Sequence, residues 1–239
     1  MIRDHRPYWM KKAHLTFQSF YVRRFLKPQF ESLGPGFTFM KPWHVRLFGA
    51  PIEMGACANV IATPDQKVRL SVWPEKKGMG GIRIGDYCLI CPGVRIGSAM
   101  EIVIGDNCMI AGNAYIADSD WHDIHNRISA GRPRPVDIGD NVWIGDGAIV
   151  CKGVSIGANS VIGAGSVVTH SVPPNAVAAG NPAKVVRKFD PNARFLKRDA
   201  WFSDPFGLET EIDRLDREML KENTFFGWLS HILFPQKGD

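Results

Sequence analysis

The sequence has no uninterrupted apolar run near the ~20 residues that a membrane-spanning helix needs. Cysteine is scarce and odd in number, 5 in 239 residues, which favours free thiols in a reducing compartment over a disulfide framework. The first residues, Met-Ile-Arg-Asp-His-Arg, lack the apolar block and cleavage site of a secretory signal peptide. These shortages argue against a membrane-spanning or disulfide-stapled protein, and we expect a cytoplasmic one.

Glycine, by contrast, is abundant at 24 of 239 residues, above the usual ~7%, yet it lacks the every-third spacing of collagen. Apolar residues make up 45% of the chain, which excludes a disordered protein. The net charge of +5 is concentrated in residues 1–50, where nine Lys/Arg stand against two Asp/Glu. We expect no nucleic-acid partner, and the basic segment leaves contact with the inner face of the membrane open.

The chain repeats every six residues. An aliphatic residue recurs at this spacing, in most cases followed by a small one: Ile84, Ile90, Ile96, Ile104, Ile110, Ile116, Ile138, Ile144, Val150, Ile156, Ile162 and Val168. Neither a helix nor a simple strand holds such a phase. Short strands separated by tight corners do, with the aliphatic residue and the small residue two places before it facing inward. Three faces then make a coil of 18 residues, and the coils stack through parallel pairing.

Breaks in the phase mark where the chain leaves the coil. The step from Ile96 to Ile104 is eight residues, and the step from Ile116 to Ile138 is 22. The sequence therefore predicts three regions: a basic and aromatic helical segment at 1–44, the coil domain at 45–189 with a loop extruded at 118–136, and a helical extension at 190–239. Functional residues often lie in loops on rigid scaffolds.

This repeat resembles that of the hexapeptide-repeat acetyl-CoA-dependent acetyltransferases, in particular the sugar O-acetyltransferases. The resemblance implies an all-β fold, a left-handed parallel β-helix, here with helical segments at both ends. It also implies a homotrimer with active sites between neighbouring β-helices. The spacing itself does not show the handedness.

The extruded loop contains His122 and His125, which match the pair that the family places before a coil reading Asn-Val-Trp-Ile-Gly, here 141–145. A histidine suits the removal of an acceptor proton at neutral pH. The resemblance implies that His122 is the general base. Further acceptor-site candidates are Asn113, Asp118, Asp120, His125 and Trp143; each has an ordinary role in a turn or in packing as its alternative, and Asp123 could also orient His122.

The stretch 162–187, which includes Val-Pro-Pro-Asn-Ala-Val-Ala-Ala-Gly-Asn-Pro-Ala-Lys, matches the C-terminal signature of family members that use acetyl-CoA. By position, the backbone of Ala164 and Thr169 would bond the pantetheine amides, with Gly145 nearby. Lys184 and Arg187 would meet the CoA phosphates. His170 stands where the family often has Lys or Arg, which weakens that contact.

We expect no metal. Cys88 and Cys91 form a single C-x-x-C without a second pair, so zinc is not favoured. The γ-type carbonic anhydrases share the implied fold but need three zinc-binding histidines, and this loop offers two.

The resemblance thus predicts transfer of acetyl from acetyl-CoA to a sugar hydroxyl, in a surface polysaccharide or its lipid-linked precursor. N-acetylation of an amino-sugar or antibiotic amine, and a non-catalytic β-helix scaffold, are the alternatives. Residues 7–27 place Phe17, Phe20, Tyr21 and Phe25 on one helical stripe among basic residues. That stripe either packs against the coils or a neighbouring subunit, or lies on an anionic membrane.

Overall fold

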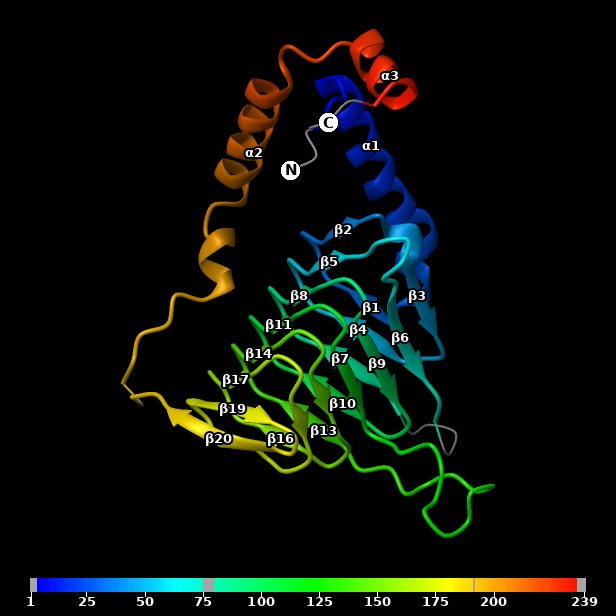
Figure 1. Cartoon of the computed structure of the whole chain (residues 1–239), viewed down its shortest axis with the longest axis vertical. Coiled ribbons are helices and arrows are strands. Elements are labelled where there is room, and N and C mark those ends of the chain that lie inside the picture. The colour runs from blue at the N-terminus through cyan, green and yellow to red at the C-terminus, as the bar shows by residue number, and fades with distance from the viewer. Residues whose placement is uncertain (1–3, 75–79, 191, 236–239) are drawn as a thin grey trace. The chain divides into compact units, whose positions relative to one another are not determined.

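The computed structural model describes residues 4–74, 80–190 and 192–235 (Figure 1). It divides into two compact units. The larger unit, Tyr21–Asp199, contains every β-strand described. The smaller unit joins the chain before Tyr21 to the chain after Asp199.

The larger unit is a stack of coils in which successive strands join three different sheets in turn (Figure 1). Sheet A consists of β1 (Ser32–Leu33), β4 (Ile52–Met54), β7 (Ile82–Ile84), β10 (Ile102–Ile104), β13 (Val136–Ile138) and β16 (Ser155–Ile156). Sheet B consists of β2 (Thr38–Met40), β5 (Asn59–Ile61), β8 (Leu89–Ile90), β11 (Met109–Ile110), β14 (Trp143–Ile144), β17 (Val161–Ile162), β19 (Ala176–Gly180) and β20 (Ala183–Lys188). Sheet C consists of β3 (Val45–Phe48), β6 (Val68–Val72), β9 (Arg95–Ser98), β12 (Tyr115–Ala117), β15 (Ile149–Val150) and β18 (Val167–Val168).

The pairing is parallel, except that β20 runs antiparallel to β19. The repeated aliphatic residues pair with one another across coils, as Ile104 does with Ile84 and Ile138. All of them are buried in one continuous core. The small residues two places before them, such as Cys108 and Ala114, are buried too. The predicted inward face is therefore confirmed.

The chain turns at three corners, named here for the sheets they join. At the A–B corner, carboxylates link consecutive coils: Asp106 Oδ1 accepts from Asp86 N at 2.8 Å, and Asp140 Oδ1 from Asp106 N at 2.9 Å. A Cβ at Gly85 or Gly105 would clash with these carboxylates. Glycine is thus required there for the close approach of neighbouring coils.

The coil begins earlier than the sequence predicts. Two strands, β1 and β2, lie within residues 1–44, which were expected to be a helical segment. Leu33, Phe39 and Val45 follow the six-residue spacing and are buried. An aromatic residue at the middle position and a step of seven to Ile52 obscure the phase.

The chain before β1 closes the end of the core. It forms a π-helical turn at Val22–Leu26 and a 3₁₀ turn at Lys27–Gln29, after α1 (Tyr8–Tyr21). Val22, Leu26 and Phe30 are buried in the same core as the coils. Of the predicted stripe, Tyr21 packs against this core, whereas Phe17, Phe20 and Phe25 are about half exposed.

After β20 the chain runs back along the coils as a strap, residues 192–199 (Figure 1). Arg198 Nε donates to Tyr87 O and Asp199 N donates to Asn107 Oδ1, both at 2.7 Å. A 3₁₀ turn at Arg198–Phe202 follows. The strap therefore ties the C-terminal extension to the A–B corner.

The smaller unit contains most of α1, together with α2 (Pro205–Leu220) and α3 (Phe225–Leu233). Ion pairs join its helices: Lys11 to Asp216 at 2.6 Å and Lys12 to Asp213 at 2.7 Å. The bonds from Lys12, Arg217 and Tyr8 hold the pKa of Asp213 well below its usual range. No helix among the described residues is long and apolar enough to span a membrane.

Candidate active site

The only step of 22 residues in the six-residue phase falls between β12 and β13, at the corner that joins sheets C and A. The chain between these strands, residues 118–135, projects from the coil stack (Figure 1). This insertion carries His122, so its attachment determines where the imidazole lies.

Asp118 fixes the first residue of the loop. Its side chain is fully buried and accepts from Ser98 Oγ at 2.7 Å. It also accepts from the backbone amides of Ala99, Met100 and Glu101 at 2.6–2.8 Å. A buried carboxylate needs this many donors to offset its lost hydration. The structure thus gives Asp118 a structural role in place of the predicted contact with the acceptor.

Lys152 clamps the two ends of the loop. Its Nζ pairs with Asp120 Oδ2 at 2.6 Å and donates to Arg132 O at 2.9 Å. Lys152 belongs to the C–A corner one coil later, and its side chain is 18% exposed. Asp120, predicted to contact the acceptor, is thereby engaged in holding the loop. Sequence reasoning missed Lys152, because only the stacking of the coils brings it to the loop.

The His122 ring is exposed and anchored on one side. Its Nδ1 lies 3.0 Å from Arg127 O. A carbonyl oxygen can only accept, so this bond places the ring proton on Nδ1 and leaves the Nε2 lone pair directed elsewhere. Gly131 passes close to the backbone here, since a Cβ there would lie 2.7 Å from His122 O. Gly131 is a second position that sequence reasoning missed.

Hydrogen bonds within the loop shape the segment after His122. Asp123 Oδ1 accepts from the amides of His125 and Asn126, at 2.8 and 2.9 Å. The bonds from Asn126 and His125 lower the pKa of Asp123. Asp123 N donates to Ser129 O at 3.0 Å. Asp123 thus supports the turn, and His125 is an exposed residue of that turn.

Trp121 connects the loop to sheet C. Its Nε1 donates to Tyr115 OH at 3.1 Å. The indole lies against Gly97, where a Cβ would come within 3.1 Å of the ring. Trp121 has a φ of +64°. The residue before His122 is therefore held on the outer surface of the coil.

The other predicted acceptor residues lie at the B–C corner or beside it. Asn113 is an exposed corner residue with a φ of +58°, and its N donates to Pro92 O at 2.9 Å. Trp143 is on β14 and is 48% exposed on the outer face of sheet B. Neither residue belongs to the C–A corner that carries His122.

The residues predicted to bind the acetyl donor are also divided between the B–C and C–A corners. Gly145 and Ala164 stack at the B–C corner, because a Cβ at Gly145 would lie 2.6 Å from Ala164 N. Thr169 and His170 lie at the C–A corner, where Thr169 Oγ1 is 2.9 Å from His170 Nδ1. Ala164, Thr169 and His170 are exposed.

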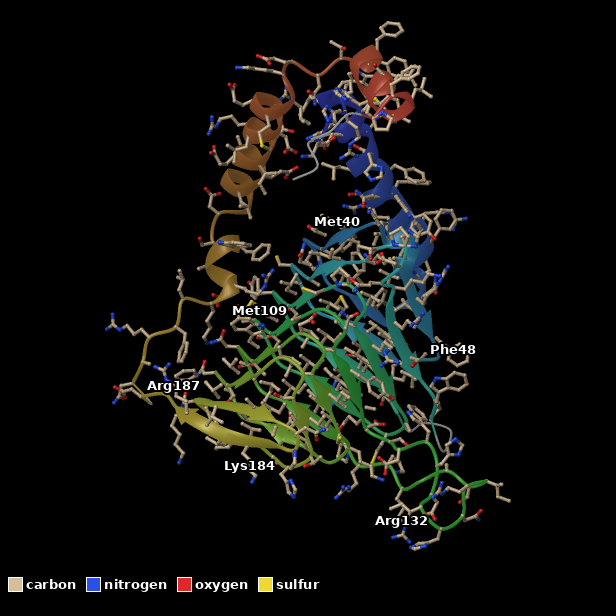
Figure 2. The ribbon with its side chains drawn as sticks, viewed as in Figure 1. Met40, Phe48, Met109, Arg132, Lys184 and Arg187 are labelled. Carbon is tan, nitrogen blue, oxygen red and sulfur yellow. The ribbon has the colours of Figure 1, made fainter. Side chains whose placement is uncertain are left out.

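Lys184 and Arg187 project from β20. Figure 2 shows both on the opposite side of the larger unit from Arg132 in the loop. Arg187 Cζ lies 5.6 Å from the centre of the Phe189 ring. The predicted residues of one coil stack therefore lie at or beside the B–C corner, at the C–A corner, and on β20.

No group of three or more His, Cys, Asp or Glu residues in the described chain could hold a metal ion. Cys88 is buried, and its Sγ donates to Gly105 O at 3.2 Å. Cys91 belongs to the following corner and is half-buried. Burial raises the pKa of its thiol. Cys88 and Cys91 thus occupy one buried and one half-buried position of the repeat.

Two family profiles match within the coil domain. "Bacterial transferase hexapeptide (six repeats)" matches residues 135–170, and "Hexapeptide repeat of succinyl-transferase" matches residues 100–117. "Putative colanic acid biosynthesis acetyltransferase WcaF" of Escherichia coli (strain K12) is 33% identical over 144 residues, 60% of this chain and 72% of that protein. The chain belongs to the hexapeptide-repeat acetyltransferase family.

Galactoside O-acetyltransferase of Escherichia coli (strain K12) is 45% identical over 92 residues, 37% of this chain and 45% of the relative. The chain thus spans about half the length of some of the curated relatives it matches. Among solved structures, the N-acyltransferase AntD from Bacillus cereus, in complex with dTDP and 3-hydroxybutyryl-CoA, superimposes with a TM-score of 0.55. At 17% identity over 83% of this chain and 94% of AntD, that likeness shows the fold.

Replacing Lys152 by Met should loosen the loop. Both bonds of the clamp are lost, and the half-exposed Asp120 limits the effect through solvent screening, so we expect amide exchange at 118–134 to accelerate about five- to tenfold. Hydrogen exchange measured by mass spectrometry tests this. Asp120→Asn is the matched control, because it keeps the bond from Lys152 to Arg132 O. Unchanged amide exchange in Lys152→Met would show that Lys152 does not hold the loop.

Proposed function

We propose that this protein transfers acetyl from acetyl-CoA to a hydroxyl of a sugar, in a surface polysaccharide or its lipid-linked precursor. The observation that carries the proposal is the anchored imidazole of His122, whose Nδ1 is bound to Arg127 O. Membership of the acetyltransferase family and the matches to a galactoside O-acetyltransferase and to WcaF support the choice of reaction and acceptor.

In the proposed reaction, Nε2 of His122 takes the proton of the acceptor hydroxyl as its oxygen attacks the thioester carbonyl carbon. The carbon–sulfur bond then breaks, and the imidazolium returns the proton to the departing thiolate. An exposed ring with one fixed nitrogen suits this role, because its orientation is set before the acceptor binds. Neither a cysteine nor a serine of the described loop is paired with His122, and direct transfer needs no acyl-enzyme.

The acyl donor would lie along the coil. Ala164 and Thr169 would bond the pantetheine through their backbones, with Gly145 close by, and all three positions lack a bulky side chain. Lys184 and Arg187 are exposed cations suited to phosphates. His170 is exposed beside Thr169 and offers a hydrogen bond there in place of a fixed charge.

We further propose a homotrimer of left-handed coils with three sites between neighbouring subunits. The division of the predicted residues between the B–C and C–A corners supports this. His122 of one subunit would meet Trp143, Gly145 and Ala164 of the next, so that the two groups complete one site. A closed ring of three subunits forms three such sites.

Contact of α1 with an anionic membrane surface extends this proposal. Phe17 and Phe20 are about half exposed, and the exposed Arg23 and Arg24 follow this helix directly in the chain. Aromatic rings beside basic side chains are typical of helices that lie at a membrane surface. Such contact would bring a lipid-linked acceptor to the protein.

His122→Ala should lower turnover by about 10²–10⁴-fold, the usual contribution of a general base. Affinity for CoA should be unchanged, because the His122 side chain is not among the predicted donor contacts. Steady-state kinetics and calorimetry measure the two quantities, with His125→Ala as the matched histidine control. Wild-type turnover in His122→Ala would defeat the assignment, and absence of CoA binding to the wild type would favour a non-catalytic scaffold. Release of the product's acetyl by mild base distinguishes an ester from an amide.

Mixing two inactive variants tests for shared sites. Ala164→Trp should block the donor without harming the fold, since Ala164 is exposed. After subunit exchange, His122→Ala and Ala164→Trp should together recover about a quarter of wild-type activity, the chance that two independent subunits both supply the intact residue. A mixture that stays inactive after exchange would place both residues of a site in one chain.

Co-sedimentation with vesicles of anionic lipid tests the membrane contact. Replacing Phe17 and Phe20 together by Ser should reduce binding at least about tenfold, because each ring would lose its burial in the lipid interface. Leu196→Ser, at a fully exposed position of the strap, serves as the control. Equal recovery of the variant and the wild type would rule out this helix as the contact.

A further inference from the structure

A column of arginines runs along the outer face of sheet C. Arg46, Arg69 and Arg95 are direct partners on three adjacent strands, β3, β6 and β9. All three side chains are exposed. Neighbouring strands lie about 4.8 Å apart, so the three residues start from evenly spaced positions along the stack. Like charges placed directly opposite on a sheet destabilise it.

No ion pair among the described residues involves Arg46, Arg69 or Arg95. Sheet A behaves differently, because its Arg83 pairs with Glu101 at 2.8 Å. The three arginines of sheet C therefore lack the kind of ion pair that Arg83 makes on sheet A.

A recess of about 230 Å³ lies at the edge of this column, at the B–C corner. Its charged lining consists of Lys67, Arg69 and Arg95 against one carboxylate, Asp65. The Thr63 hydroxyl lowers the pKa of Asp65. Three cations against one anion leave the recess positive, so it favours an anionic ligand.

Aromatic rings flank the column on the neighbouring row of sheet C. Phe48 is the partner of Ser71, which is the partner of Gly97. Phe48 and Trp73 stack with ring centres 4.1 Å apart, and each is 53% exposed. Trp121 covers Gly97. The row thus has a ring at each end and Ser71 between them, a surface on which flat apolar faces of sugar rings can rest.

The column leads to the proposed base. Arg95 Cζ lies 4.6 Å from the centre of the Tyr115 ring, and Tyr115 OH accepts from Trp121 Nε1 at 3.1 Å. Trp121 directly precedes His122. A ligand held along the arginines would therefore extend toward the loop that carries the imidazole.

We propose that the outer face of sheet C binds an acidic glycan, a chain of sugars bearing carboxylates, and presents one of its hydroxyls to His122. Arg46, Arg69 and Arg95 would pair with successive carboxylates, because the guanidinium fork matches a carboxylate in two hydrogen bonds. The three guanidinium groups are spaced along the stack. This spacing suits a polymer that carries a carboxylate on successive sugars better than a single compact pyrophosphate. This inference rests on the proposed function, since it names the acceptor class of the same site.

Binding of oligogalacturonate and of hyaluronan fragments, measured by calorimetry without acetyl-CoA, tests the proposal. The uncharged methyl ester of oligogalacturonate is the matched ligand. We expect the wild type to bind at least one acidic chain, with an affinity that falls as salt rises, and not to bind the ester. Arg69→Gln should weaken binding at least about tenfold. Arg83→Gln, the same change on sheet A, should leave it unaltered.

Several results would overturn the inference: no binding of either acidic chain, equal binding of the ester, or equal effects of Arg69→Gln and Arg83→Gln. A loss of CoA affinity in Arg69→Gln would show that the arginine column binds the acetyl donor and not the glycan. A change in oligomeric state would make it a subunit contact. Transfer of acetyl is measured separately, so glycan binding without transfer would defeat the proposed function alone. Transfer without acidic-glycan binding would defeat this inference alone.

Discussion

Burial of one aliphatic side chain every six residues is the interaction on which the larger unit depends. Its strands are mostly two or three residues long, too short to be stable individually. The aliphatic side chains of successive coils meet in register, as Ile110 does with Ile90 and Ile144. This register places each corner residue next to its counterpart in the following coil.

The loop that carries His122 shows how a rigid scaffold holds an insertion. The first residue, Asp118, is fixed inside the protein by four donors, and the returning chain is held by Lys152 through Arg132 O. Between these points the loop is shaped by its own hydrogen bonds, and the imidazole stands exposed. The attachment is thus rigid, while the part that would meet the acceptor lies outside the core.

The sequence predicted what depends on periodicity and could not predict what depends on register. Inward positions and the site of the insertion follow from the spacing alone. Asp118 and Asp120 look alike in the sequence, yet one is buried and the other pairs with Lys152. The arginines of sheet C are 23 and 26 residues apart, not 18, because insertions intervene. Only the pairing of β3, β6 and β9 shows that they form a column.

The reversed strand β20 has a consequence for how long the molecule can grow. A stack of parallel coils leaves unpaired backbone groups at each end, and a second molecule could continue the stack there. At one end Val22, Leu26 and Phe30 cover the core. At the other, β20 offers sheet B an edge of opposite direction that carries Lys184, Arg187 and Lys188. Charged side chains on an edge strand disfavour pairing with a further strand, so the cations proposed to hold CoA would also hinder end-to-end growth.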